Sequence, residues 1–145
     1  MGLPIKIADV APRLATGAYI LHSGLDKAKA DEAHAKGYHA MASGTYPFLA
    51  KIEPATFTKL LAGGEIVLGA TLLAPVVSTA LAGAALAAFS AGLLGLYAKT
   101  PGMRKEGSIW PSQQGIGVSK DVWMLGIGLG FVTDAVANRR GRKRG

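Results

Sequence analysis

The sequence predicts an all-α membrane protein, a bundle of four transmembrane helices with an extended loop or helix between the first and the second. Composition is the first reason. Half of the 145 residues are hydrophobic, 17% are charged and the mean hydropathy is +0.30, whereas a soluble domain has roughly 25% charged residues. Glycine is the second reason, because the chain has 20 glycines and small residues let membrane helices approach closely. The third reason is a long run without charge in the middle of the chain.

That run covers residues 66–98, which are 33 consecutive uncharged residues. As one helix it would be ~50 Å long, against a hydrocarbon core of ~30 Å. A break is therefore needed, and Pro75 supplies it because proline interrupts a helix interior. We predict a tight hairpin of two spanning helices, at about residues 57–74 and 76–98.

Two shorter uncharged runs flank this hairpin, at residues 14–25 and 122–133. Runs of this length fit either a core helix or part of a membrane span. Extended to about residues 7–25 and 118–137, each becomes long enough to cross a bilayer. Four spans is the prediction, and two spans with two interfacial helices is the alternative.

The connections between these helices differ in composition. The first, at about residues 26–56, is long and charged, and its segment 28–42 is rich in alanine and free of proline. We expect that segment to be helical beyond the membrane. The connection at about residues 99–120 is rich in glycine and proline, which is typical of a loop. Trp110, and Trp123 early in the last helix, fit an interfacial aromatic belt.

The C-terminus carries the densest charge in the chain. We divide the sequence into one transmembrane four-helix domain, residues 1–138, and a basic tail, residues 139–145. The cations of the tail are Arg139, Arg140, Arg142, Lys143 and Arg144. Cations that directly follow a span are retained in the cytoplasm, so an even number of spans places both termini there. We expect the tail to contact anionic membrane lipids rather than nucleic acid.

Glu65 is the charged residue that most needs an explanation. It follows the expected helix start at Phe57 by eight residues, or ~12 Å, and a carboxylate at that depth requires a partner or a role. Lys27, His22, or Asp26 through a shared proton, are the available partners at the matching end of the first span. One interpretation is a site that handles protons or binds a polar head group. The other is a structural pair that joins the first two spanning helices.

The candidate polar cluster is therefore His22, Lys27 and Glu65. Tyr19, His22 and Asp26 also share one stripe of a helix, and a quinone or lipid could bind near Tyr19, His22 and Glu65. Hydrogen bonds between helices are the alternative explanation of the stripe. No metal site is expected, because His22 has no second histidine three or four residues on and the other two histidines are five apart.

Two patterns predict how the helices pack. Asp134 lies one residue beyond the last apolar run, and we expect it to pair with Arg13 across the bundle, with a role as a relay acid as the alternative. Glycines and small residues predict close helix packing. They are Gly92, Gly95, Gly126, Gly128, Gly130 and the stretch 83–87.

Several enzyme classes lack their parts in this sequence. The chain has no cysteine, which excludes disulfides, thiolate metal sites and cysteine nucleophiles. It also has no Gly-x-Ser-x-Gly motif, and no glycine cluster carries the Lys-Ser/Thr pair of a phosphate-binding loop. We therefore expect no catalytic activity from the chain on its own, and no intrinsic cofactor beyond a bound quinone or lipid.

The order of these features resembles the DoxX family of small four-helix bacterial membrane proteins. Three stretches carry the resemblance: RLATGAYILHSGLDK at 13–27, GGEIVLGATLL at 63–73 and KDVWMLG at 120–126. The first ends like the family's "hGxxK" pattern, with Gly24 and Lys27, and the second resembles its second helix, with Glu65 between small residues. The charged first loop and the arginine-rich tail depart from a minimal member, which suggests a specialised subgroup.

The resemblance implies an accessory or structural subunit of a larger membrane complex in the bacterial plasma membrane, respiratory or redox-linked. The family includes a quinone-linked subunit of thiosulfate oxidation and partners of oxidative-stress complexes. A quinone-proximal oxidoreductase subunit is therefore one alternative. A small transporter or lipid-handling protein that uses Glu65 is the other.

Overall fold

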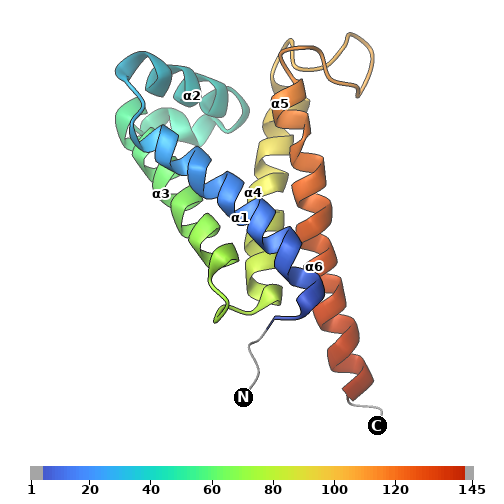
Figure 1. The fold of residues 1–145 in the computed structure, drawn as a ribbon. Helices are drawn as coiled ribbons and strands as arrows, with labels where there is room; N and C mark the ends of the chain where they lie inside the picture. The colour runs from blue at the N-terminus through green and yellow to red at the C-terminus, as the bar shows by residue number, and fades with distance from the viewer. Residues whose placement is uncertain (1–4, 143–145) are drawn as a thin grey trace.

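The computed structural model describes residues 5–142, and its regular elements are all helices (Figure 1). They are α1 (Ile7–Ala28), α2 (Glu32–Thr45), the 3₁₀ helix η1 (Pro47–Lys51), α3 (Pro54–Leu73), α4 (Thr79–Lys99), the short α5 (Ile116–Ser119) and α6 (Asp121–Arg142). The predicted all-α class is therefore confirmed.

The helices α1 and α3 form the first of two tightly packed pairs. Glycines make this contact possible, because a Cβ atom on Gly69 would lie 2.7 Å from the backbone nitrogen of Leu21. On α1, a Cβ at Gly24 would lie 2.9 Å from the Cβ of Glu65. The first pair is thus held at a separation that side chains at these positions would prevent.

The helices α4 and α6 form the second pair, which also depends on glycine. Gly83 and Gly128 face each other, and a Cβ on Gly83 would lie 2.9 Å from the carbonyl oxygen of Gly128. Of the expected ladder on α6, Gly126 and Gly130 would meet nothing within 4 Å. Two residues advance a helix by about 200°, so these two glycines lie on the outer face.

The two pairs contact each other less extensively than the helices within each pair do. The shared core lies where Ile20 and Leu72 of the first pair approach Ala82, Leu86 and Phe131 of the second. In Figure 1 the start of α1 and the end of α6 lie at one end of the molecule, and α2 lies at the other. We call these the termini end and the α2 end.

The hairpin between the two central helices forms as the proline predicts. The helix α3 ends at Leu73 and α4 begins at Thr79, on either side of Pro75. The Ser78 side chain accepts a hydrogen bond from the Leu81 backbone N–H at 3.3 Å and so caps α4.

The expected helix of the first connection is present but begins later. The chain breaks at residues 29–31, and α2 starts at Glu32 and packs against α3. Asp31 caps it by accepting from the His34 backbone N–H at 2.9 Å. Hydrogen bonds from the backbone and ring of His34 hold the pKa of Asp31 below its usual value.

Three helices are long and apolar enough to cross a membrane: α3, α4, and the helical stretch Ile116–Gly141, which spans α5 and nearly all of α6. These three helices are consistent with a membrane protein. The helix α6 runs to Arg142, so the first residues of the basic tail continue a helix. Lys143 and Arg144 lie outside the described residues.

Gly69→Ala should destabilise the first pair, because its methyl group meets the backbone of Leu21. We expect a loss of about 1–3 kcal/mol, the usual cost of overpacking, in the free energy of unfolding measured in mixed detergent micelles. Gly64→Ala on the same helix is the control, since its Cβ meets nothing within 4 Å. Equal stability of the two variants would contradict the packing.

Candidate functional site

A cavity of about 480 Å³ lies between the two helix pairs. The α2 segment and η1 contribute Tyr38, Met41, Ala42, Tyr46 and Leu49 to its wall. The helix pairs contribute Tyr19, Ile20, Ser23, Lys27, Phe57, Leu61, Glu65, Ala88, Phe89, Gly92, Leu93, Leu96, Asp121 and Met124, and α5 contributes Val118. Most of this wall is apolar or aromatic, and its charges lie together.

The charged part of the wall is an ion pair between α1 and α3. The Lys27 Nζ lies 3.1 Å from Glu65 Oε1 and 3.2 Å from Oε2. The Glu65 side chain is 5% exposed and that of Lys27 is 18% exposed. Glu65 is eleven residues into α3, about 16 Å along the helix axis, so this carboxylate is both deep and buried.

Further contacts hold the ammonium group of Lys27 in place. It donates a hydrogen bond to Ser23 Oγ at 2.7 Å and lies 5.6 Å from the centroid of the Tyr38 ring. Buried charges are tolerated when they are paired and hydrogen-bonded. The partner that the depth of Glu65 demanded is therefore Lys27, the first of the three expected from the sequence.

The other residues expected near this site are arranged differently. Tyr19 lines the cavity, although the residue is 66% exposed. His22 is outside the cluster: its Nε2 lies 3.2 Å from Asp26 Oδ2, and both side chains are largely exposed. His22 and Lys27 are five residues apart, or about 140° around a helix, so both cannot face α3.

Asp121 is a wall residue that the sequence argument missed. It is half-buried, lines the cavity and interacts electrostatically with Glu65 and Lys27. A signal was available in the order of the helices. In an up-and-down arrangement the end of α1 and the start of α6 lie at the same end, which brings Asp121 towards Lys27.

At the termini end, Arg13 joins α1 to the hairpin. Its guanidinium is buried and donates to Leu72 O through Nε at 2.7 Å and to Thr79 Oγ1 through Nη1 at 3.0 Å. It also donates to the carbonyl oxygens of Thr71, Ala74 and Val77. These include carbonyls that the end of a helix leaves without partners. The predicted Arg13–Asp134 pair is therefore wrong.

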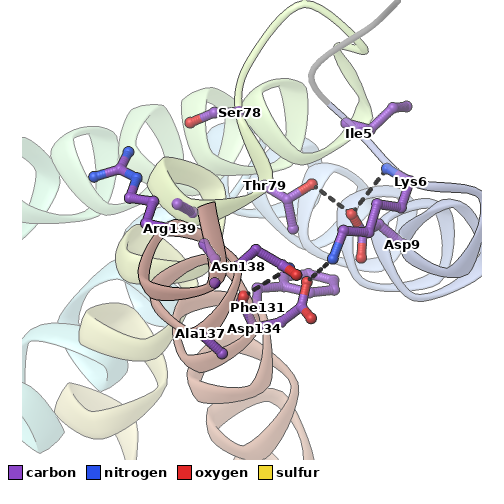
Figure 2. A pocket seen from close by; sticks show the side chains of 13 residues that line it. Ile5, Lys6, Asp9, Ser78, Thr79, Phe131, Asp134, Ala137, Asn138 and Arg139 are labelled. Atoms are coloured by element: carbon purple, nitrogen blue, oxygen red, sulfur yellow. Dashed lines mark hydrogen bonds and ion pairs between the residues drawn. The ribbon is translucent and has the colours of Figure 1, made fainter. Parts of the chain in front are cut away.

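Asp134 instead pairs with Lys6. Both residues line a second cavity, of about 650 Å³, which Figure 2 shows. Beside this pair, Asp9 Oδ2 accepts from Thr79 Oγ1 at 3.0 Å and from the backbone N–H of Lys6 at 3.1 Å. These bonds connect the start of α1 to α4 and α6. The helix pairs are thus tied together at the termini end.

The two cavities differ in what they offer a ligand. At the termini end Lys6 is already paired with Asp134, and the Asp9 carboxylate accepts hydrogen bonds from Thr79 and from the Lys6 backbone N–H. At the α2 end an apolar and aromatic wall surrounds a few convergent polar groups, the pattern of a small-molecule site. Within residues 5–142, no three histidine, aspartate or glutamate side chains gather as metal ligands.

No protein-family model matches the chain, and neither the curated proteins nor the solved structures contain a match. The resemblance to the DoxX family therefore depends on the three sequence stretches alone.

Lys27→Met should leave the Glu65 carboxylate buried without a partner, at a cost of about 3–5 kcal/mol. The Lys27→Met/Glu65→Leu double variant should recover most of that loss, because an apolar pair replaces the ion pair. Unfolding in mixed detergent micelles measures both.

Lys36→Met is the control, since it breaks the exposed Lys36–Glu32 pair on α2 and should change stability little. A Lys27→Met protein as stable as the wild type would contradict the account of the buried pair.

Proposed function

We propose that this protein is an integral membrane protein that binds a small amphipathic molecule in the cavity between its two helix pairs. The observation that carries the proposal is the 480 Å³ cavity with the Lys27–Glu65 ion pair in its wall. An ion pair whose only role was to hold two helices together could be covered completely by neighbouring side chains. Here it borders a space of the size that ligand sites have, about 300–1,000 Å³.

The distribution of polarity around the cavity supports an amphipathic ligand. The charged side chains of the wall lie near one another, whereas residues such as Phe89, Leu93 and Leu96 form its apolar part. A lipid or a quinone has this division between a polar head and an apolar body. The transporter or lipid-handling class is the one that this cavity favours.

We further propose that α1 is a fourth span. Its 22 residues are about 33 Å long, enough for the hydrocarbon core. Its inward positions include Asp9, Arg13 and Thr16, whereas Leu14 and Leu25 are exposed. A helix of a soluble protein has the reverse pattern. Internal partners satisfy Asp9 and Arg13. The outer face of α1, with its exposed leucines, therefore suits contact with lipid.

A second candidate function is the accessory subunit of a larger complex, which the DoxX resemblance implies. The specific observation in its favour is the outer face of α6, where Gly126 and Gly130 are open and Trp123 is 68% exposed. Small residues four apart suit a helix of another chain. A larger membrane complex as the partner, and contact of the basic tail with anionic lipids, stay predictions from the sequence.

The four-span topology predicts which residues are reached from outside the cell. With both termini in the cytoplasm, as Lys6, Arg139 and Arg140 at that end favour, a membrane-impermeant maleimide should label Glu106→Cys in intact cells. It should not label Val76→Cys or Ile5→Cys. The chain has no cysteine of its own, so the background is low.

Ile5→Cys is the informative variant. If it were labelled together with Glu106→Cys, α1 would not cross the membrane. Complete reversal, with Val76→Cys and Ile5→Cys labelled and Glu106→Cys protected, would keep four spans and overturn the orientation.

Gly92→Leu should abolish ligand binding, because it projects a side chain into the cavity. Its Cβ meets nothing within 4 Å, and leucine is the better helix former, so we expect no loss of stability. Native mass spectrometry of the protein from its own membranes should detect a bound small molecule on the wild type and not on Gly92→Leu.

Gly63→Leu is the matched control. Gly63 is also helical, and a Cβ there would likewise meet nothing within 4 Å, but Gly63 does not line the cavity. Retention of the bound molecule by Gly92→Leu, or its absence from the wild type, would contradict the proposal.

A further inference from the structure

We infer that the cavity selects a ligand whose polar end is a cationic ammonium group, held by Asp121 and by the aromatic rings that line the cavity. The inference rests on the proposed function and narrows its ligand class. It makes a cationic amphiphile, rather than an anion or a quinone, the ligand that the wall fits.

The charges of the wall do not cancel. Among the described residues, those that line the cavity with a charge are Lys27, Glu65 and Asp121, one cation and two anions. Glu65 neutralises Lys27 at 3.1 Å. The carboxylate of Asp121 is left over, and within residues 5–142 it has no hydrogen bond or salt bridge of its own.

The cation of the wall is already engaged. Lys27 Nζ donates to Glu65 and to Ser23 Oγ and lies over the Tyr38 ring. An anionic head group would have to displace Glu65 from Lys27 and would also face Asp121. A quinone carbonyl would likewise compete with Glu65 for the same donor. A cation meets neither obstacle.

The wall of the cavity also carries several aromatic side chains. Tyr19, Tyr38, Tyr46, Phe57 and Phe89 all line this one cavity. The face of an aromatic ring attracts a cation, and cages of such rings are used to bind quaternary ammonium groups. A surplus carboxylate and five aromatic rings in the wall of one largely apolar cavity are complementary to an organic cation.

The test compares three small aromatic probes of different charge. Benzyltrimethylammonium is the cation, benzyl alcohol the neutral probe and phenylacetate the anion. Each is titrated by calorimetry into the full chain in lipid nanodiscs, with protein-free nanodiscs as the blank. We expect the cation to bind at least about tenfold more tightly than benzyl alcohol, the scale of a charge-assisted contact, and phenylacetate to bind most weakly.

Asp121→Asn should remove the preference for the cation, by about tenfold in affinity, and leave benzyl alcohol unaffected. Asp26→Asn is the matched control, because Asp26 is an exposed carboxylate that also lies at the α2 end of the molecule but does not line the cavity. If Asp121→Asn fails to fold, the order of the three probes on the wild type still decides.

The outcomes separate this inference from the proposed function. Equal binding of the cation and benzyl alcohol, both lost in Gly92→Leu, would overturn the ammonium preference and leave the cavity as a ligand site. Preference for phenylacetate would also overturn it. Binding of none of the probes would overturn the inference, and with no small molecule on the native protein the proposed function would fail as well.

The ammonium group could belong to a membrane lipid or to a free amine, and lipid composition distinguishes these sources. In nanodiscs that contain phosphatidylethanolamine, a lipid occupant should weaken the binding of benzyltrimethylammonium relative to nanodiscs of phosphatidylglycerol alone. Unchanged binding would support a free amine as the natural ligand.

Discussion

The structure depends on one constraint, which is that the charges on the inward face of α1 must be satisfied inside the protein. Lys27 is bound by Glu65 near one end, and Arg13 is bound by the carbonyl oxygens that end α3 near the other. Between these two points the glycines of α1 and α3 allow close backbone contact. Because an unpaired charge in a low-dielectric interior costs several kcal/mol, α1 has one favourable register along α3.

The cavity is a consequence of how the two helix pairs are joined. Lys6 and Asp9 connect them at the termini end (Figure 2), where Arg13 also donates a hydrogen bond to Thr79. At the α2 end the connection includes the hydrogen bond from the Tyr46 hydroxyl to Gly92 O at 2.8 Å. Tight packing within each pair and looser packing between them leave the space that Lys27, Glu65 and Asp121 border. The polar contacts at one end and the ligand site at the other are therefore parts of one arrangement.

The sequence alone was enough for what composition and local chemistry control. The break at Pro75 and the need of Glu65 for a partner follow from bilayer thickness and from the cost of a buried charge. The acceptors of Arg13 could not be foreseen, because most are backbone carbonyls, which no residue type reveals. Asp121 was missed because its role depends on which helix ends meet, and His22 was included although its rotation around α1 turns it outward.

The most direct measurement is a crystal structure of the protein grown from a lipid mesophase, at a resolution that shows side chains. We predict non-protein density between the helix pairs, with its polar end beside Asp121 and the Lys27–Glu65 pair, and its apolar end along Phe89 and Leu93. Helix pairs packed against each other, with those side chains filling the space, would contradict it.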